Sequence, residues 1–173
     1  MSTLKVDTIQ HTGGTTGLTI NSGGVVLQPT KPVFRVNRSA DQSIANDTVT
    51  VIQFDVKTGN NNFDIGGYFN TSTYRYLPLV AGYYSFSMGV LLEDDMYVIG
   101  NIRKNGQVEF QNRAWTESGL YSTAQVNGVI YLNGSTDYVD GVVYHYESGG
   151  GSKNIRGEDG DRSATYLCGF LIG

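Results

Sequence analysis

The sequence predicts an all-β fold, a sandwich or barrel of roughly eight to ten short strands without helices. Between Ala81 and Leu92, large apolar residues alternate with small or polar ones, which is the period of a strand with one buried face. Asn105-Gly106 is the preferred dipeptide of a two-residue hairpin turn. The 23 glycines and 12 tyrosines, against 3 prolines, are typical of short strands joined by tight turns.

The run Ala81–Leu92 is expected to be the central strand of the core, because its apolar residues all fall on one face. A strand over Thr48–Val56 and a closing strand over Thr165–Ile172 are expected to add further core side chains. The candidate core residues are Ile52, Phe54, Tyr84, Phe86, Met88, Val90 and Phe170.

The remaining strands follow from shorter apolar runs separated by turn residues. They are expected over Val33–Asn37, Tyr97–Arg103, Val108–Gln111, Ser122–Leu132 and Tyr138–Tyr146. The last two are expected to pair with each other through a turn at Asn133–Asp137. The glycine-rich, charged stretch Ser148–Arg162 is expected to be a loop.

The first thirty residues differ from the rest, since they contain no aromatic residue and eight aliphatic ones. The sequence therefore predicts an N-terminal arm over residues 1–30 and a head domain over residues 31–173. The arm is too small to build a core, so it is either flexible or packed against copies of itself. We favour packing, because a disordered segment has little use for so many aliphatic side chains. The candidate anchoring residues are Leu4, Val6, Ile9, Leu18 and Ile20.

Composition argues against several classes of protein. The net charge is −4 and the only basic pair is Arg103-Lys104, so nucleic-acid binding is not expected. No apolar run approaches the roughly 20 residues of a membrane-spanning helix, and the first residues do not resemble a secretion signal. A single cysteine, Cys168, leaves no internal disulfide, so stability is expected to come from the core or from oligomerisation.

No catalytic residue is predicted. A Ser-His-Asp site would need His11 or His145, and no Gly-x-Ser-x-Gly elbow supplies the serine. Structural or surface roles are expected for both histidines, and a packing role for Cys168 among apolar neighbours. A glycosidase would need two carboxylates about 5 to 10 Å apart, and the acidic residues here cluster in predicted loops.

Two acidic clusters, Glu93–Asp95 and Glu158–Asp161, are predicted to lie in loops. Oxygen-rich loops with glycine can hold calcium, and Glu158, Asp159 and Asp161 are the candidate ligands. A solvated loop without metal is the favoured alternative, and no other cofactor is expected.

The tyrosine surplus has two interpretations, because so many tyrosines cannot all lie in one core. Tyrosine offers a large face with a polar tip, so it recurs both at subunit interfaces and on sugar-binding surfaces. Subunit packing is favoured over a glycan platform for most of them.

A series of motifs then runs in order from Pro32 to Gly173. They are Val51-Ile-Gln-Phe-Asp, Asn62-Phe-Asp-Ile-Gly-Gly-Tyr-Phe, Pro78-Leu-Val-Ala-Gly-Tyr-Tyr-Ser-Phe, Ile102-Arg-Lys-Asn-Gly-Gln, Val129-Ile-Tyr-Leu, Asp137-Tyr-Val and Cys168-Gly-Phe-Leu-Ile. Their order and spacing resemble the globular-head family of the first complement component, which shares the jelly-roll fold of tumour necrosis factor. Thr136 before Asp137, and Thr165-Tyr-Leu-Cys, depart from the family pattern. The resemblance implies a two-sheet antiparallel jelly-roll sandwich, a homotrimer, and calcium binding of the kind that some members show.

The arm has no collagen repeat. Its Ser2-Thr-Leu-Lys-Val-Asp-Thr-Ile and Ser22-Gly-Gly-Val segments resemble N-terminal arms of bacteriophage tail-fibre and other virion appendage proteins. This resemblance implies a structural virion protein, made in the host cytoplasm, whose arm binds other virion proteins and whose head recognises a host-surface glycan or protein. The candidate recognition residues are Asn60, Asn61, Asn62, Lys153, Arg156 and Arg162. The alternatives are a stand-alone lectin-like module and a fibre-borne glycan hydrolase.

Overall fold

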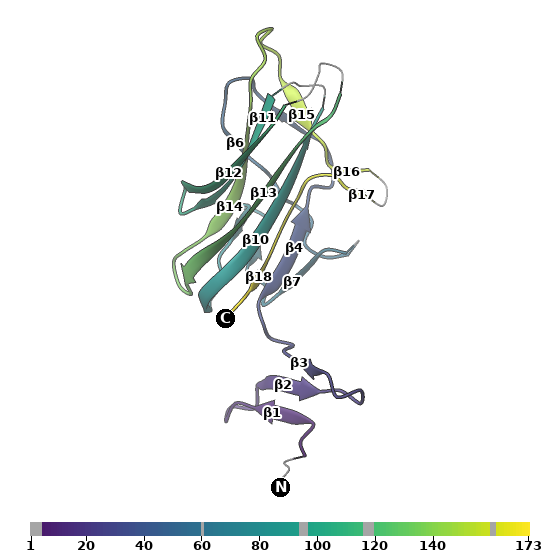
Figure 1. The fold of residues 1–173 in the computed structure, drawn as a ribbon, viewed down its shortest axis with the longest axis vertical. Coiled ribbons are helices and arrows are strands. Elements are labelled where there is room, and N and C mark those ends of the chain that lie inside the picture. Colours follow the sequence, from purple (N-terminus) through teal and green to yellow (C-terminus); the bar gives the residue numbers. More distant parts are fainter. Residues whose placement is uncertain (1–4, 60, 94–96, 116–119, 160–161) are drawn as a thin grey trace. The chain divides into compact units, whose positions relative to one another are not determined.

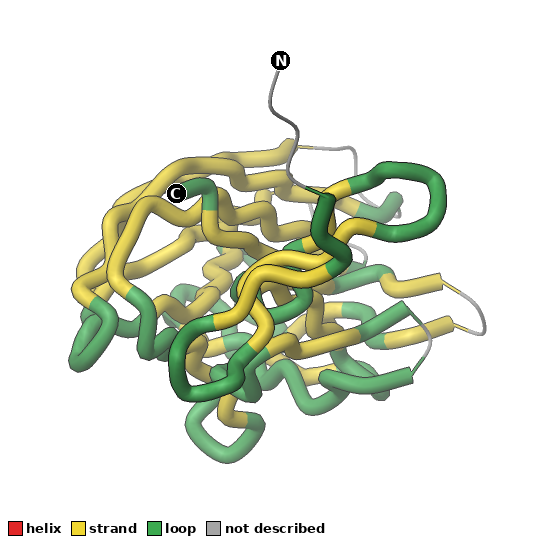
Figure 2. Tube along the Cα trace, turned by 90° about the horizontal axis from the view of Figure 1, so that it is seen from below, coloured by secondary structure: helices red, strands yellow, loops and turns green. Residues whose placement is uncertain are grey.

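The computed structural model of the protein describes residues 5–59, 61–93, 97–115, 120–159 and 162–173. Every regular element in these ranges is a strand, as Figure 2 shows. Consequently, no helix among them is long and apolar enough to cross a membrane. The chain divides into two compact units, Met1–Lys31 and Pro32–Gly173.

The smaller unit is a three-stranded antiparallel sheet in the order β1 (Thr8–Gln10), β2 (Thr16–Ile20), β3 (Val26–Leu27). Ile9 pairs with Leu18, and Ile20 with Val26, so these four aliphatic side chains share one face. None of the described residues up to Thr30 is buried, and Val6 is only half-buried, while Leu4 lies outside the described residues. The described residues of this unit therefore form no core of their own.

The larger unit is a sandwich of two antiparallel sheets (Figure 1). Its strands are β4 (Val33–Asn37), β5 (Gln42–Ile44), β6 (Thr50–Val51), β7 (Phe63–Ile65), β8 (Phe69–Asn70), β9 (Arg75–Tyr76), β10 (Ala81–Leu92), β11 (Tyr97–Lys104), β12 (Gln107–Trp115), β13 (Ser122–Asn133), β14 (Val139–His145), β15 (Lys153–Ile155), β16 (Glu158–Asp159), β17 (Arg162–Ser163) and β18 (Tyr166–Leu171). We call the sheet with the order β5-β15-β10-β18-β4-β7, with β13 also paired to β10, the β10 sheet. The sheet with the order β12-β11-β14-β9-β8, with β6 paired to β14, is the β11 sheet.

The strand β10 has the bounds that the alternation predicts and lies within its sheet. It pairs with β13 along its whole length and with β18 over Tyr84–Gly89. The predicted core residues Ile52, Phe54, Tyr84, Phe86, Met88 and Val90 are all 2% exposed or less.

Phe86 fits the core because it lies between two glycines. Gly128 on β13 and Gly169 on β18 are its direct cross-strand partners. A Cβ on Gly169 would lie 2.8 Å from Phe86 Cδ1 and 3.0 Å from the Phe34 ring. A Cβ on Gly128 would lie 2.2 Å from Phe110, whose ring reaches over from the β11 sheet. Aromatic rings therefore occupy the space above both glycines.

The expectation for Phe170 is wrong, because this side chain is 50% exposed. Leu167 and Gly169 point into the core, so the alternation of β18 directs Cys168 and Phe170 to the outer face of the sheet. The apolar residues at the end of the chain do not show which face is buried, because Gly169, a residue without a side chain, occupies an inward position.

The expected pairing of the two long strands near Asn133 is also wrong. The strand β13 pairs with β10, whereas β14 pairs with β11, so the turn between them crosses from one sheet to the other. The Asn133 side chain accepts the N–H groups of residues 135, 136 and 137, each at 3.0 Å. The Asp137 carboxylate accepts hydrogen bonds from Asn105 Nδ2 at 2.7 Å and from the Asn133 N–H at 3.0 Å. Lys104 Nζ lies 2.9 Å from the same carboxylate.

The bonds from Asn105 and Lys104 hold the pKa of Asp137 below its usual value. Because Asn105 belongs to the turn between β11 and β12, the carboxylate joins that turn to the sheet-crossing turn. The Asn105-Gly106 hairpin is confirmed, with φ of 51° and 82° at its two central residues.

The Ser148–Arg162 stretch is more regular than expected. It contains β15, which pairs with β5 and with the end of β10, and the two-stranded β16–β17 hairpin. In contrast, only Thr50–Val51 of the run expected over Thr48–Val56 forms a strand.

Replacing Phe86 with alanine should lower the free energy of unfolding by about 3–5 kcal/mol, because the ring leaves a cavity between two sheets. Chemical denaturation at fixed protein concentration measures the change. Ser87→Ala, on the opposite face of the same strand, is the matched control and should change stability by about 0.5 kcal/mol or less. Equal effects of the two substitutions would show that the register of β10 is wrong.

Asp137→Asn should lower the melting temperature at pH 7. The folded-state pKa of this carboxyl is below its unfolded value of about 3.9, so its stabilisation is present above that pH and disappears as the pH falls through the folded value. Thermal melts of parent and variant should therefore converge at low pH. Asp7→Asn, at an exposed carboxylate of the smaller unit, is the control. A difference that stays constant from pH 7 to strong acid would refute the assigned role.

Candidate functional site

The outer face of the β10 sheet is covered with exposed apolar side chains. Tyr83 on β10 and Tyr131 on β13 are cross-strand partners, with ring centroids 5.3 Å apart. The next row crosses five strands, from Val129 through Ser85, Phe170 and Val33 to Ile65. We call seven of these residues, each between 40% and 57% exposed, the apolar face: Phe63, Ile65, Tyr83, Val129, Tyr131, Phe170 and Ile172.

The apolar face gives way to polar side chains further along the same sheet. There the Tyr166 ring lies across Gly89, where a Cβ would come within 2.6 Å of it. The Tyr166 hydroxyl donates to Gln125 Oε1 at 3.1 Å, and the Arg35 guanidinium lies 5.4 Å from the ring centroid. Protein–protein interfaces have the same arrangement, in which an apolar centre is bordered by a rim of hydrogen-bonding side chains.

Cys168 lies between these rows on the outer face of β18. Burial raises the pKa of its thiol, although nearby Arg35 acts in the opposite direction. A raised pKa favours the protonated thiol, which is a poor nucleophile. The geometry therefore agrees with a packing role.

The histidines are placed as structural and surface residues. His145 is fully buried, with Nε2 3.3 Å from the Ile44 carbonyl oxygen. His11 is exposed, and its Nδ1 accepts the Gly13 N–H at 3.1 Å. Within the described ranges, no three His, Cys, Asp or Glu side chains come together as a metal site.

The predicted recognition residues are mostly engaged in holding the fold. Asn62 is buried and donates to Asn37 Oδ1 at 3.0 Å, so the expectation that it is a surface contact is wrong. Arg156 pairs with Asp41 at 2.9 Å and with Glu93 at 3.7 Å. Lys153 pairs with Glu147 at 3.3 Å. These two cations pair with carboxylates that flank β5, β10 and β14, and so attach the Ser148–Arg162 stretch to the rest of the fold.

The other predicted residues of these loops are only partly described. Asn61 is exposed with a positive φ of 64°, and Asn60 lies outside the described residues. Glu158, Asp159 and Arg162 belong to the backbone of the β16–β17 hairpin, and Asp161 falls outside the described ranges. Calcium binding at this hairpin stays a prediction.

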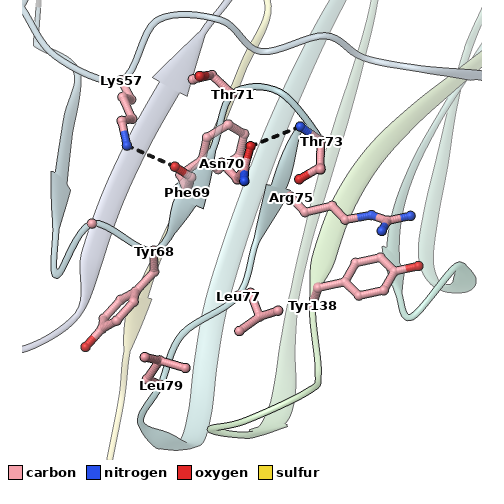
Figure 3. A pocket seen from close by; sticks show the side chains of 11 residues that line it. Lys57, Tyr68, Phe69, Asn70, Thr71, Thr73, Arg75, Leu77, Leu79 and Tyr138 are labelled. Atoms are coloured by element: carbon pink, nitrogen blue, oxygen red, sulfur yellow. Dashed lines mark hydrogen bonds between the residues drawn. The ribbon is translucent and has the colours of Figure 1, made fainter.

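A pocket of about 640 Å³ lies beside β8 and β9, and Figure 3 shows the side chains that line it. Lys57 Nζ donates to the Phe69 carbonyl at 3.0 Å and lies 3.5 Å from the Asp64 carboxylate. The Arg75 guanidinium stacks on Tyr138, 4.0 Å from the ring centroid. Leu77 and Leu79 form an apolar part of the wall (Figure 3).

The strongest ion pair near this pocket is a structural one. Arg103 donates two hydrogen bonds to the buried Asp140 carboxylate, at 2.7 and 2.8 Å, and this raises the pKa of Arg103. Arg75 lies 3.9 Å from the same carboxylate. The cations at the pocket, Lys57 and Arg75, are thus engaged by carboxylates, a backbone carbonyl or a ring.

No family model and no curated protein matches the sequence. Solved structures do match the fold. The globular domain of zebrafish complement 1qA protein superposes with a TM-score of 0.60 at 18% identity, over 83% of this chain and 98% of that one. Murine APRIL superposes with a TM-score of 0.56 at 15% identity, over 82% of this chain and 99% of that one. The predicted fold is therefore confirmed as a two-sheet antiparallel sandwich that resembles the jelly roll of complement heads and tumour necrosis factor.

The apolar face was not predicted, although the sequence contains its signal. Tyr83 lies on the outward face of β10, where its neighbours along the strand are small residues. Phe170 is three residues after the inward Leu167, so it points to the opposite face of β18. The tyrosines divide as the fold requires. Tyr76 and Tyr84 are buried, whereas Tyr83 and Tyr131 lie on the apolar face.

Proposed function

We propose that this chain is a homotrimeric, non-enzymatic binding module whose heads associate through the apolar face of the β10 sheet. The observation that carries the proposal is the face itself, a set of exposed apolar side chains on β7, β18, β10 and β13 and at Ile172 just after β18. A soluble monomer rarely exposes such a patch, and burial of it in water is favourable. Domains with this complement-head-like fold typically form trimers.

The smaller unit provides independent support for a trimer. Among the residues of this unit that the structure describes, none buries the four aliphatic side chains on its one face, and Ile9 and Val26 are both about half exposed. Three arms held together by trimeric heads would have a high effective concentration for one another. They could then bury this face against other arms or against an anchoring protein.

We further propose that the module is a bacteriophage appendage protein, located in the virion after synthesis in the host cytoplasm. The arm attaches the head to other virion proteins, and the head contacts the host surface. The support is the resemblance of the Ser2–Ile9 and Ser22–Val25 segments to tail-fibre arms, together with the uncovered aliphatic face. The head, which packs its own core, remains folded whether or not the arm is bound.

Phe170→Ser should dissociate the trimer, because it places a hydroxyl in the centre of the apolar face. Light scattering coupled to size exclusion measures the mass relative to the 18.8 kDa chain. Val108→Ser, at an equally exposed apolar residue on the β11 sheet, is the control and should leave the trimer intact. A parent protein that runs as a monomer at micromolar concentration would contradict the proposal.

Removal of residues 1–27 should leave a folded trimer that no longer joins phage particles. The head retains its core, whereas the aliphatic residues of the arm are lost. Circular dichroism and light scattering test folding and assembly, and sedimentation with particles tests incorporation. Normal incorporation of the shortened protein would refute the anchoring role without affecting the trimer.

A further inference from the structure

A groove runs along the outer face of the β11 sheet, the sheet opposite the apolar face. Two adjoining cavities of about 520 and 430 Å³ form it, and both are lined by Tyr97 and Tyr144. From Tyr97 to Arg103 the groove follows β11 for six residue steps, which is about 20 Å of strand. This length suits an extended ligand better than a compact one.

One end of the groove is aromatic. Trp115 lies opposite Tyr97 on the neighbouring strand, with ring centroids 5.6 Å apart and planes at 64°. Tyr144 lies 6.4 Å from Tyr97 with its plane at 87°. Tyr146 completes this end. Trp115 is 72% exposed and Tyr146 is 50% exposed, so ring surface remains open for a ligand.

The other end is polar and held in place by its own hydrogen bonds. Asn101 Oδ1 accepts a bond from Gln111 Nε2 at 2.9 Å. Arg103 is fixed by its two bonds to Asp140. These amide and guanidinium groups have donors and acceptors suited to hydroxyl groups, and their fixed positions reduce the entropy lost on binding.

The two charged residues that line the groove, Arg103 and Glu147, are each paired within the protein. Arg103 is paired with Asp140, and Glu147 at the aromatic end lies 3.3 Å from Lys153. The Tyr144 hydroxyl donates to Asp47 at 2.7 Å, and that bond raises the Tyr144 pKa to about 12, so the phenol stays neutral. A ligand on the lining residues therefore meets mainly rings and dipoles, with the exposed Arg113, opposite Ile99 on β12, beside them.

We propose that this groove binds an extended, uncharged oligosaccharide, with sugar rings against the aromatic end and hydroxyl groups on Arg103 and on Gln111, which the buried Asn101 holds in place. The inference rests on the proposed role of the head as a binding module and gives that role a ligand class and a place. The apolar faces of sugar rings pack on tyrosine and tryptophan, while their hydroxyls need the polar groups that follow along β11.

Two other occupants fit the observations less well. A second copy of the chain is better matched by the apolar face on the opposite sheet. An organic cation would favour rings that enclose it beside an unpaired carboxylate. Here the rings are open to solvent, and Glu147 is already paired with Lys153.

Trp115 is the only tryptophan of the chain, so intrinsic fluorescence reports directly on the groove. The full-length protein should be screened on an array of neutral bacterial-type oligosaccharides of three to six sugars, and hits titrated by calorimetry and fluorescence. We expect binding with a blue shift of the tryptophan emission, and an affinity loss of roughly tenfold or more in Trp115→Ala and Tyr146→Ala. Tyr121→Ala, at a tyrosine of similar exposure outside the groove, should bind normally.

The outcomes separate this inference from the proposed assembly. Because Trp115 and Tyr146 are exposed, their variants should keep the oligomeric mass and melting temperature of the parent, which light scattering and thermal melts check. Absence of binding to every neutral oligosaccharide would overturn the proposal, and so would binding that survives Trp115→Ala. A fluorescence shift with choline chloride but with no oligosaccharide would assign the groove to an organic cation instead. A monomeric parent that still binds oligosaccharide would refute the trimer and leave the groove assignment standing.

Discussion

The structure depends on one packing arrangement, a phenylalanine between two glycines. Phe86 projects from β10 into the sandwich, and its cross-strand neighbours Gly128 and Gly169 have no side chains to compete for the space. Rings from other strands fill that space instead, and Phe34 stacks on Tyr76 with centroids 4.0 Å apart. Because the rings come from both sheets, this contact fixes the distance between the sheets and the register of β10, β13 and β18 together.

That register decides what each sheet presents to the outside. With Gly169 inward, Phe170 must point outward, and with Gly128 inward, Val129 does the same. The apolar face is thus a consequence of how the core is packed. On the other sheet, Gly100 and Gly141 admit Met88 to the core in the same way. Their neighbours in alternation, such as Ile99 and Val142, lie along the outer groove.

Local features of the fold were readable from the sequence. The alternation of β10 and the Asn105-Gly106 hairpin each depend on residues close in the chain, and both are confirmed. The partners of β13 and β14 were not readable, because a turn that crosses between sheets and a hairpin turn use the same residue types. The apolar face was not predicted for a related reason. An aromatic residue next to a glycine, such as Phe170, is predicted to be buried unless it is known which residues of its strand point inward. A polar loop residue such as Asn62 is predicted to be exposed unless its buried hydrogen-bond partner is known.

The outer faces of the two sheets have different proposed roles, and these roles are compatible with a trimer. If the apolar face is buried by trimer formation, the outer face of the β11 sheet stays exposed on each subunit. One trimer then presents three grooves. A shallow groove with open rings buries only part of its ligand, so a single site is expected to bind weakly. Linked sites raise the overall affinity without any new contact, provided that one polymer or one cell surface reaches them together. Weak sites in fixed multiples bind repetitive surfaces selectively, since isolated sugars occupy one groove at a time and dissociate quickly. The exposure of Trp115 and Tyr146 then costs the protein little stability and keeps each contact reversible.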